Sequence, residues 1–139
     1  MTPLQASRAI RDLTKVPSQS ARPVSVRIKA DIERYFSAGE DPYGKAWAPL
    51  RPATLAKGRH PPPLTDTHDG RDGITVTPAQ GAGVRITSNT SYMVHHMRKS
   101  GNRAARKFLP EGVTPKQWEK IYQEELEKAS RKVLSGLGT

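Results

Sequence analysis

The chain changes character at Asp41 to Ala56, which read Asp-Pro-Tyr-Gly-Lys-Ala-Trp-Ala-Pro-Leu-Arg-Pro-Ala-Thr-Leu-Ala. Three prolines in this stretch fix φ and lack a backbone donor, so no regular helix or central strand can run through it. Trp47, Leu50 and Leu55 are nonetheless large apolar side chains, which are costly to leave in water. We therefore expect these three residues to anchor a proline-rich loop on the core.

A helix is predicted immediately before this loop, over Val24 to Ala38. Apolar residues recur there at helical spacing (Ile28, Ile32, Tyr35 and Phe36), and charged residues fill the other positions. Ser20 or Ser25 is a candidate N-cap, and Gly39 stands where a C-cap glycine belongs. Pro17 to Pro23 is expected to break the shorter helical pattern of residues 3 to 15, so residues 1–23 are predicted to form a separate arm.

Two strands are predicted after the loop, because Gly73 to Pro78 and Gly83 to Ser88 alternate apolar and polar residues. The glycine-rich link between them has hairpin length, so the strands should pair antiparallel, with Ile74 and Val76 facing one way. Two strands alone are marginally stable in water. We therefore expect the preceding helix to cover the sheet, and Arg106 to Leu109 to supply a third strand.

A second long helix is predicted near the end of the chain, over Thr114 to Leu134. Thr114 as N-cap, Pro115 at the first position and Gln117 form a capping-box pattern, and apolar residues follow at helical spacing. Residues 135–139 should fray. The predicted fold class is thus α+β: a small antiparallel sheet packed by an N-terminal helix, with a C-terminal helix and long loops rich in proline and glycine, forming one domain over residues 24–134.

The charge of the chain is strongly positive, with 23 Lys and Arg against 13 Asp and Glu. Only 35% of the 139 residues are hydrophobic, so we expect part of the apolar surface to be buried against other subunits. There is no cysteine, which excludes disulfides and thiolate chemistry. Residues 1–15 are too polar for a signal peptide, so we expect the protein to be made in the cytoplasm.

Catalytic and metal-binding signals are weak. The four histidines are His60, His68, His95 and His96. The last two are adjacent and would point apart on a helix or a strand, unlike zinc ligands. Asp66, Asp69 and Asp72 could be pictured as a magnesium or acid–base cluster, but Arg71 lies among them. No nucleophile elbow and no phosphate-binding glycine loop occur. We expect no enzyme activity, no metal and no cofactor.

A basic segment lies between the predicted hairpin and the C-terminal helix. Residues 98–107 contain five cations and no acid, and the cations are Arg98, Lys99, Arg103, Arg106 and Lys107. Such a composition suits phosphate contact without sequence preference, since the aromatic residues of a single-strand binder are missing. Contact with acidic groups on a neighbouring subunit and a plainly solvated loop are the alternatives.

Several of these stretches resemble one family in the same order. The Asp41 to Ala56 stretch follows the pattern D-P-x-G-x-x-W-x-P-L-x-P-x-T-L-A. Leu64 to Asp72 then follows L-x-D-T-x-x-x-R-D, a strand and polar turn lead to Tyr92 and His96, and Ala105 to Leu109 is similar to A-R-P-F-L. Together they resemble the phage virion morphogenesis family, the tail-completion proteins of Mu-like phages. Lys107 departs from the pattern, which usually has proline at that position.

The resemblance implies a structural virion protein that completes the tail or forms part of the head–tail neck. Such a protein would act as a subunit of a closed ring, commonly a hexamer, around the DNA channel. Its partners would be its own copies, tail and connector proteins, and the passing genomic DNA. It would be assembled in the host cytoplasm and reside in the virion. Tyr92 and His96 would support packing or an interface. The alternatives are a nonspecific DNA-binding protein acting outside virions and a metal-dependent hydrolase that uses residues Asp66 to Asp72.

Overall fold

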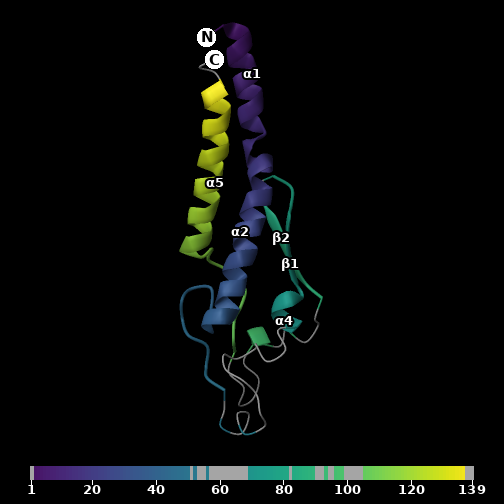
Figure 1. Cartoon of the computed structure of the whole chain (residues 1–139), viewed down its shortest axis with the longest axis vertical. Helices are drawn as coiled ribbons and strands as arrows, with labels where there is room; N and C mark the ends of the chain where they lie inside the picture. The colour runs from purple at the N-terminus through teal and green to yellow at the C-terminus, as the bar shows by residue number, and fades with distance from the viewer. Residues whose placement is uncertain are drawn as a thin grey trace. The chain divides into compact units, whose positions relative to one another are not determined.

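The computed structural model describes residues 2–50, 52, 56, 69–81, 83–89, 93, 96–98 and 105–136. Its helices are α1 (Pro3–Thr14), α2 (Val16–Ala38), the single turn α4 (Asp69–Asp72) and α5 (Lys116–Ser135), and its strands are β1 (Ile74–Pro78) and β2 (Val84–Ser88) (Figure 1). The predicted α+β class is confirmed: a two-stranded antiparallel sheet accompanies an N-terminal and a C-terminal helix. Within the described residues, no helix is both long enough and apolar enough to span a membrane.

The chain divides into two compact units. The first, here called the helical unit, comprises residues 1–28, 76–85 and 117–139. The second, here called the loop unit, comprises residues 29–75 and 86–116. Helix α2 and the β1–β2 hairpin each contribute residues to both units.

The helical unit contains α1, the first part of α2 and α5 (Figure 1). Helix α1 begins with a capping box in which Gln5 N–H donates to Thr2 Oγ1 at 3.1 Å and Thr2 N–H donates to Gln5 Oε1 at 2.8 Å. Helix α5 begins at Lys116, one residue after the predicted first position. The core of the unit is drawn from all three helices, and its buried apolar residues are Ala9, Val16, Ala21, Val24, Ile28, Trp118 and Ile121.

Helix α2 begins earlier than predicted. The prediction that Pro17 to Pro23 ends the N-terminal helical segment is wrong, because α2 runs from Val16 through both prolines. Pro17 lies in the first turn, where a helix needs no N–H donor. Pro23 is interior, but residues 16, 20, 21 and 24 around it are all buried, and such packing can outweigh a local propensity.

The prediction that Ser20 or Ser25 caps the start of the helix is wrong, because both serines lie inside α2. Ser20 Oγ donates to the carbonyl of Pro17 at 2.9 Å, and Ser25 Oγ donates to the carbonyl of Arg22 at 2.7 Å, so both bond back to the preceding turn. Both side chains are thereby satisfied inside the helical unit, where both residues are buried.

The loop unit is built on the second half of α2. Ile32, Tyr35 and Phe36 are almost completely buried, as their spacing predicted. Tyr35 donates its hydroxyl to Asp31 Oδ2 at 2.6 Å, and Arg34 pairs with Asp31 at 2.9 Å. The helix ends at Gly39, whose φ of 67° and N–H bond to the Tyr35 carbonyl at 2.8 Å make it the expected C-cap.

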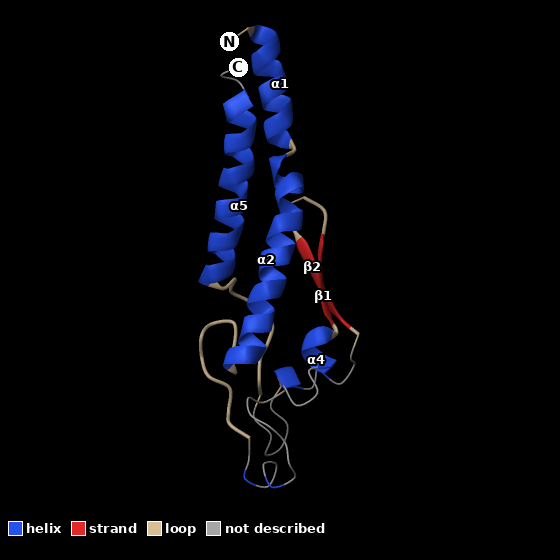
Figure 2. Cartoon of the chain, viewed as in Figure 1, coloured by secondary structure: helices blue, strands red, loops and turns tan. Residues whose placement is uncertain are grey.

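The hairpin has the predicted position and facing (Figure 2). Ile74 is buried and Val76, Val84 and Ile86 are half-buried, while the residues between them are exposed. The turn closes with an N–H bond from Ala79 to the Gly83 carbonyl at 2.8 Å, and Gly81 adopts the positive φ that the link requires. Lys29 of α2 donates to the Ile74 carbonyl at 3.3 Å.

The predicted third strand is wrong. Residues 105–110 have no regular secondary structure, and the only sheet among the described residues has two strands. The hydrogen-bonding groups of this segment are used otherwise: the Lys107 carbonyl accepts from a tryptophan side chain, and the Phe108 N–H lies 3.4 Å from Met97 Sδ. These irregular bonds position the candidate site.

Candidate functional site

The chain leaves α2 through a tight turn that presents Trp47. Asp41 Oδ1 accepts the N–H groups of Tyr43 and Lys45, each at 2.9 Å, and Asp41 N–H donates to the Lys45 carbonyl at 2.8 Å. Gly44 has a φ of 89°, a value that residues with a side chain rarely adopt. The turn returns the chain to the end of α2, where Trp47 N–H donates to the Gly39 carbonyl at 2.7 Å.

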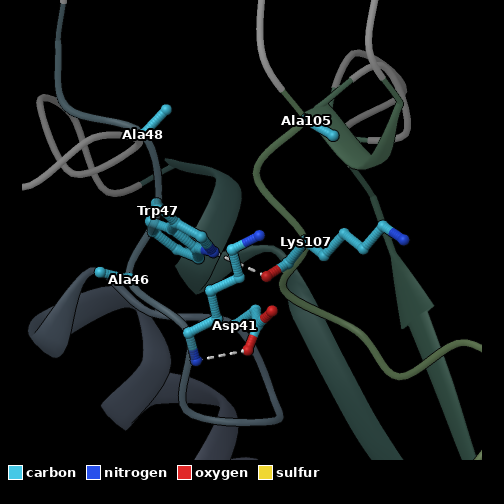
Figure 3. Close-up of a pocket in the computed structure, with 7 residues that line it drawn as sticks. Asp41, Ala46, Trp47, Ala48, Ala105 and Lys107 are labelled. Atoms are coloured by element: carbon cyan, nitrogen blue, oxygen red, sulfur yellow. Dashed lines mark hydrogen bonds between the residues drawn. The ribbon is translucent and has the colours of Figure 1, made fainter.

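Trp47 is buried, and it contacts both α2 and the segment that contains Lys107. Its ring meets Phe36 edge-on, with centroids 5.5 Å apart and planes at 81°. Its Nε1 donates to the Lys107 carbonyl at 2.7 Å (Figure 3). Phe108, the next residue, packs on the same Phe36 with centroids 5.6 Å apart. The Phe36 side chain of α2 therefore contacts two aromatic residues, Trp47 and Phe108, from loops that lie about sixty residues apart in sequence.

Two polar side chains also connect the same loops. Arg106 Nε donates to the Ala48 carbonyl at 2.9 Å, and its Nη2 donates to the Pro49 carbonyl at 3.0 Å. The Tyr43 hydroxyl lies 2.7 Å from the Val113 carbonyl and accepts the Glu111 N–H at 3.2 Å. We call residues 41–49 together with 105–113 the clasp.

A hollow of about 400 Å³ opens in the clasp, and Figure 3 shows the residues that line it. Two of its charged groups already have partners: the Asp41 carboxylate accepts backbone N–H groups, and Lys107 Nζ pairs with Glu111 at 3.1 Å. The lining residues are Asp41, Lys45, Ala46, Trp47, Ala48, Ala105 and Lys107. The hydrogen bonds beside the hollow join residues 47–49 to residues 106 and 107, so this geometry suits holding two loops together.

The predicted site residues fall into different places. Trp47 and the half-buried Leu50 lie in or beside the clasp, and so do Arg106 and Lys107. Arg98 is exposed, and half-buried His96 accepts the Arg106 N–H on its carbonyl at 2.7 Å. Four of the predicted residues lie outside the described part of the chain: Leu55, Tyr92, Lys99 and Arg103.

The candidate metal and acid–base residues are described only in part. His60, His68, His95 and Asp66 lie outside the described residues. Asp72 is described, and its carboxylate pairs with Arg71 at 2.9 Å. Across the described residues, no group of three or more His, Asp or Glu side chains is arranged to hold a metal ion.

An ionic cluster in the helical unit was not predicted from the sequence. Arg27 of α2 pairs with Glu124 at 2.9 Å and with Glu125 at 3.2 Å, both on α5. The hydrogen bond with Glu124 is the main cause that raises the pKa of Arg27, against the lowering effect of partial burial. Arg27 fits the polar side of a predicted amphipathic helix, so only its position opposite α5 reveals the pairing.

Comparisons with protein-family models, with curated proteins and with solved structures found no match to this chain.

Proposed function

We propose that the chain is a structural subunit of a phage particle, of the tail-completion kind, which acts as an oligomeric ring at the tail end or the head–tail neck. The clasp carries the proposal. Two of the motifs on which the resemblance was drawn, around Trp47 and around Arg106 to Phe108, hydrogen-bond to each other. Residues that fit the pattern therefore have a common task in building one structural element.

The uses of the motif side chains favour a scaffold over a catalyst. Trp47 and Arg106 both donate to backbone carbonyls, and Asp41 accepts backbone N–H groups. Such bonds fix the course of the chain, which is what a scaffold requires of these groups. In the region of the hydrolase alternative, the carboxylate of Asp72 is paired with its neighbour Arg71.

The surface apolar residues support a subunit that completes its burial against others. Leu4 is 61% exposed and Ile10 is 65% exposed, and Val113 and Leu134 are also large exposed hydrophobic residues. Single exposed apolar residues are common on monomers. In a chain with only 35% hydrophobic residues, however, each one left in water removes a sizeable part of the available burial.

Sedimentation velocity and negative-stain imaging of the purified full-length protein test the proposal. We expect a closed ring of defined copy number, formed cooperatively with concentration. A matched pair of variants locates the contact: Ile10→Ser should weaken assembly, whereas Ser7→Ala on the same helix should not. A protein that stays monomeric at all concentrations and also fails to bind purified tails or connectors would contradict the assignment.

A further inference from the structure

A stripe of cations at helical spacing follows one face of the N-terminal helices. Arg8, Arg11, Lys15 and Arg22 are separated by three, four and seven residues, which places them on the same side of a helix. The spacing persists from α1 into α2 because Gln19 N–H donates to the Lys15 carbonyl at 2.9 Å, an i to i+4 bond across the junction. Figure 1 shows α2 continuing on from α1. We call these four residues the basic stripe.

The basic stripe faces away from the core of the helical unit. All four cations are exposed, whereas Ala9, Val16, Ser20 and Val24, on the opposite side of the helices, are buried. The stripe is therefore the solvent side of an amphipathic helix pair whose other side is already occupied.

The stripe is also without acidic partners among the described residues. Later in α2, Arg27, Lys29 and Arg34 each form an ion pair, and on α5 Lys120, Lys128 and Arg131 do so. No described carboxylate lies within ion-pair distance of a stripe residue, and Asp12 is the only acid in residues 1–30. Among the described residues, these cations of α2 and α5 are thus paired with acids, whereas the cations of the basic stripe are not.

We propose that the basic stripe binds the phosphate backbone of duplex DNA without sequence preference. Three of its four residues are arginines, whose guanidinium groups match phosphate oxygens in pairs. The fourteen helical steps from Arg8 to Arg22 span about 21 Å, over which one DNA strand presents about six phosphates. The stripe is separate from the clasp, and the inference holds whether or not the chain forms rings.

Other partners fit less well. A second copy of this chain is a poorer match in charge, because the chain as a whole carries +10 and α5 contains five cations against four acids. A lipid surface would need apolar side chains between the cations. The stripe face has only Leu4 and Val26, which are separated by about 33 Å of helix.

Fluorescence anisotropy with a labelled random-sequence duplex, measured over a series of salt concentrations, tests the proposal. A variant with Arg8, Arg11, Lys15 and Arg22 all changed to Gln is compared with a control in which Lys116, Lys120, Lys128 and Lys132 on α5 are changed to Gln. Both lose four positive charges. The stripe variant should lose about 3 to 4 units from the slope of log K against log salt, and the control should lose much less.

Circular dichroism should show that both variants keep the helical content of the wild type. Equal losses in the two variants would mean that net charge alone drives binding and would overturn the proposal. Failure of the wild type to bind the duplex at about 50 mM salt would do the same. So would tighter binding to polyglutamate or to phosphatidylglycerol vesicles than to DNA, which would assign the stripe to an acidic protein or a membrane.

Discussion

The indole Nε1 of Trp47 donates to the main-chain carbonyl of Lys107 at 2.7 Å. This bond joins the end of the loop that follows α2 to the segment that leads towards α5. Its acceptor is a backbone atom, so the bond constrains the path of the chain at Lys107 and not the identity of that side chain. The pattern that the sequence resembles has proline at this position, and lysine in its place leaves the contact intact, because either residue has the carbonyl that accepts the bond.

Replacing Trp47 should destabilise the loop unit strongly. Trp47→Ala removes a buried aromatic ring and its edge contact with Phe36, and we expect a loss of about 3 to 5 kcal/mol in the free energy of unfolding. Trp47→Phe keeps most of the ring contact but leaves the Lys107 carbonyl without this donor, which should cost about 1 to 2 kcal/mol. Urea unfolding followed by circular dichroism measures both losses.

The second tryptophan supplies a control for this experiment. Trp118 belongs to the helical unit, so its fluorescence in the Trp47 variants reports on that unit separately. Equal stability of Trp47→Ala and wild type would show that the indole does not hold the clasp.

Replacing Arg27 should lower the free energy of unfolding, because the buried Glu125 carboxylate loses a paired cation. The Glu125 side chain is only 6% exposed, and Arg27 is one of the two cations that pair with it. Because the Arg27 side chain is itself 35% exposed, we expect Arg27→Met to cost about 1 to 3 kcal/mol, less than a fully buried pair. The double variant Arg27→Met, Glu125→Gln should recover part of the loss.

A matched variant separates the two carboxylates that Arg27 contacts. Glu124 is 42% exposed, so Glu124→Gln should change stability by no more than about 1 kcal/mol. A larger effect for Glu124→Gln than for Glu125→Gln would reverse the assigned importance of the two pairs. Thermal or urea unfolding of the wild type, Arg27→Met, Glu125→Gln and the double variant completes the double-mutant cycle, and Glu124→Gln is measured beside it.

The sequence was informative where structure depends on near neighbours. The buried face from Ile28 to Phe36, the C-cap at Gly39 and the facing of the hairpin all follow from spacing and turn chemistry. The clasp was foreseen only in part. The burial of Trp47 follows from its size, but its partner at Lys107 does not, because a backbone acceptor has no signature in sequence.

The course of α2 was missed for a different reason. Local propensity assigns Pro17 to Pro23 to a break, whereas the buried residues Val16, Ala21 and Val24 pack within the helical unit. That unit also contains most of α5, which lies about a hundred residues further along the chain, and no short window of sequence contains both. The basic stripe is a consequence of this continuous helix and could not be recognised without it.

Replacing the interior proline of α2 should stabilise the protein. Pro23 provides no N–H for the helix, and an interior proline is about 3 kcal/mol less favourable than alanine. Proline also restricts the unfolded chain, and losing that restriction offsets about 0.4 to 1 kcal/mol of the gain. Because the helix around Pro23 is already adapted to the ring, we expect Pro23→Ala to raise the free energy of unfolding by about 1 to 2 kcal/mol. Pro17→Ala, in the first turn, should give no gain. A decrease in the urea midpoint of Pro23→Ala would show that packing of the proline ring matters more than the missing bond.

Stability at high pH should depend on Tyr122 of α5. Burial raises the pKa of its hydroxyl, because the ionised form loses hydration in the folded protein. The unfolded chain, with a pKa of about 10, then releases this proton before the folded chain does. The unfolded state therefore binds fewer protons above about pH 10, and the free energy of unfolding falls as the pH rises through that value and on to the folded pKa. Below about pH 9 the hydroxyl is protonated in both states, so it does not make the free energy of unfolding depend on pH.

Urea unfolding of the wild type and Tyr122→Phe at a series of pH values measures the effect. The plots of unfolding free energy against pH should run parallel near neutral pH, and the variant should lose stability less steeply in the alkaline range. Curves that stay parallel throughout would show that the hydroxyl is fully hydrated in the folded protein.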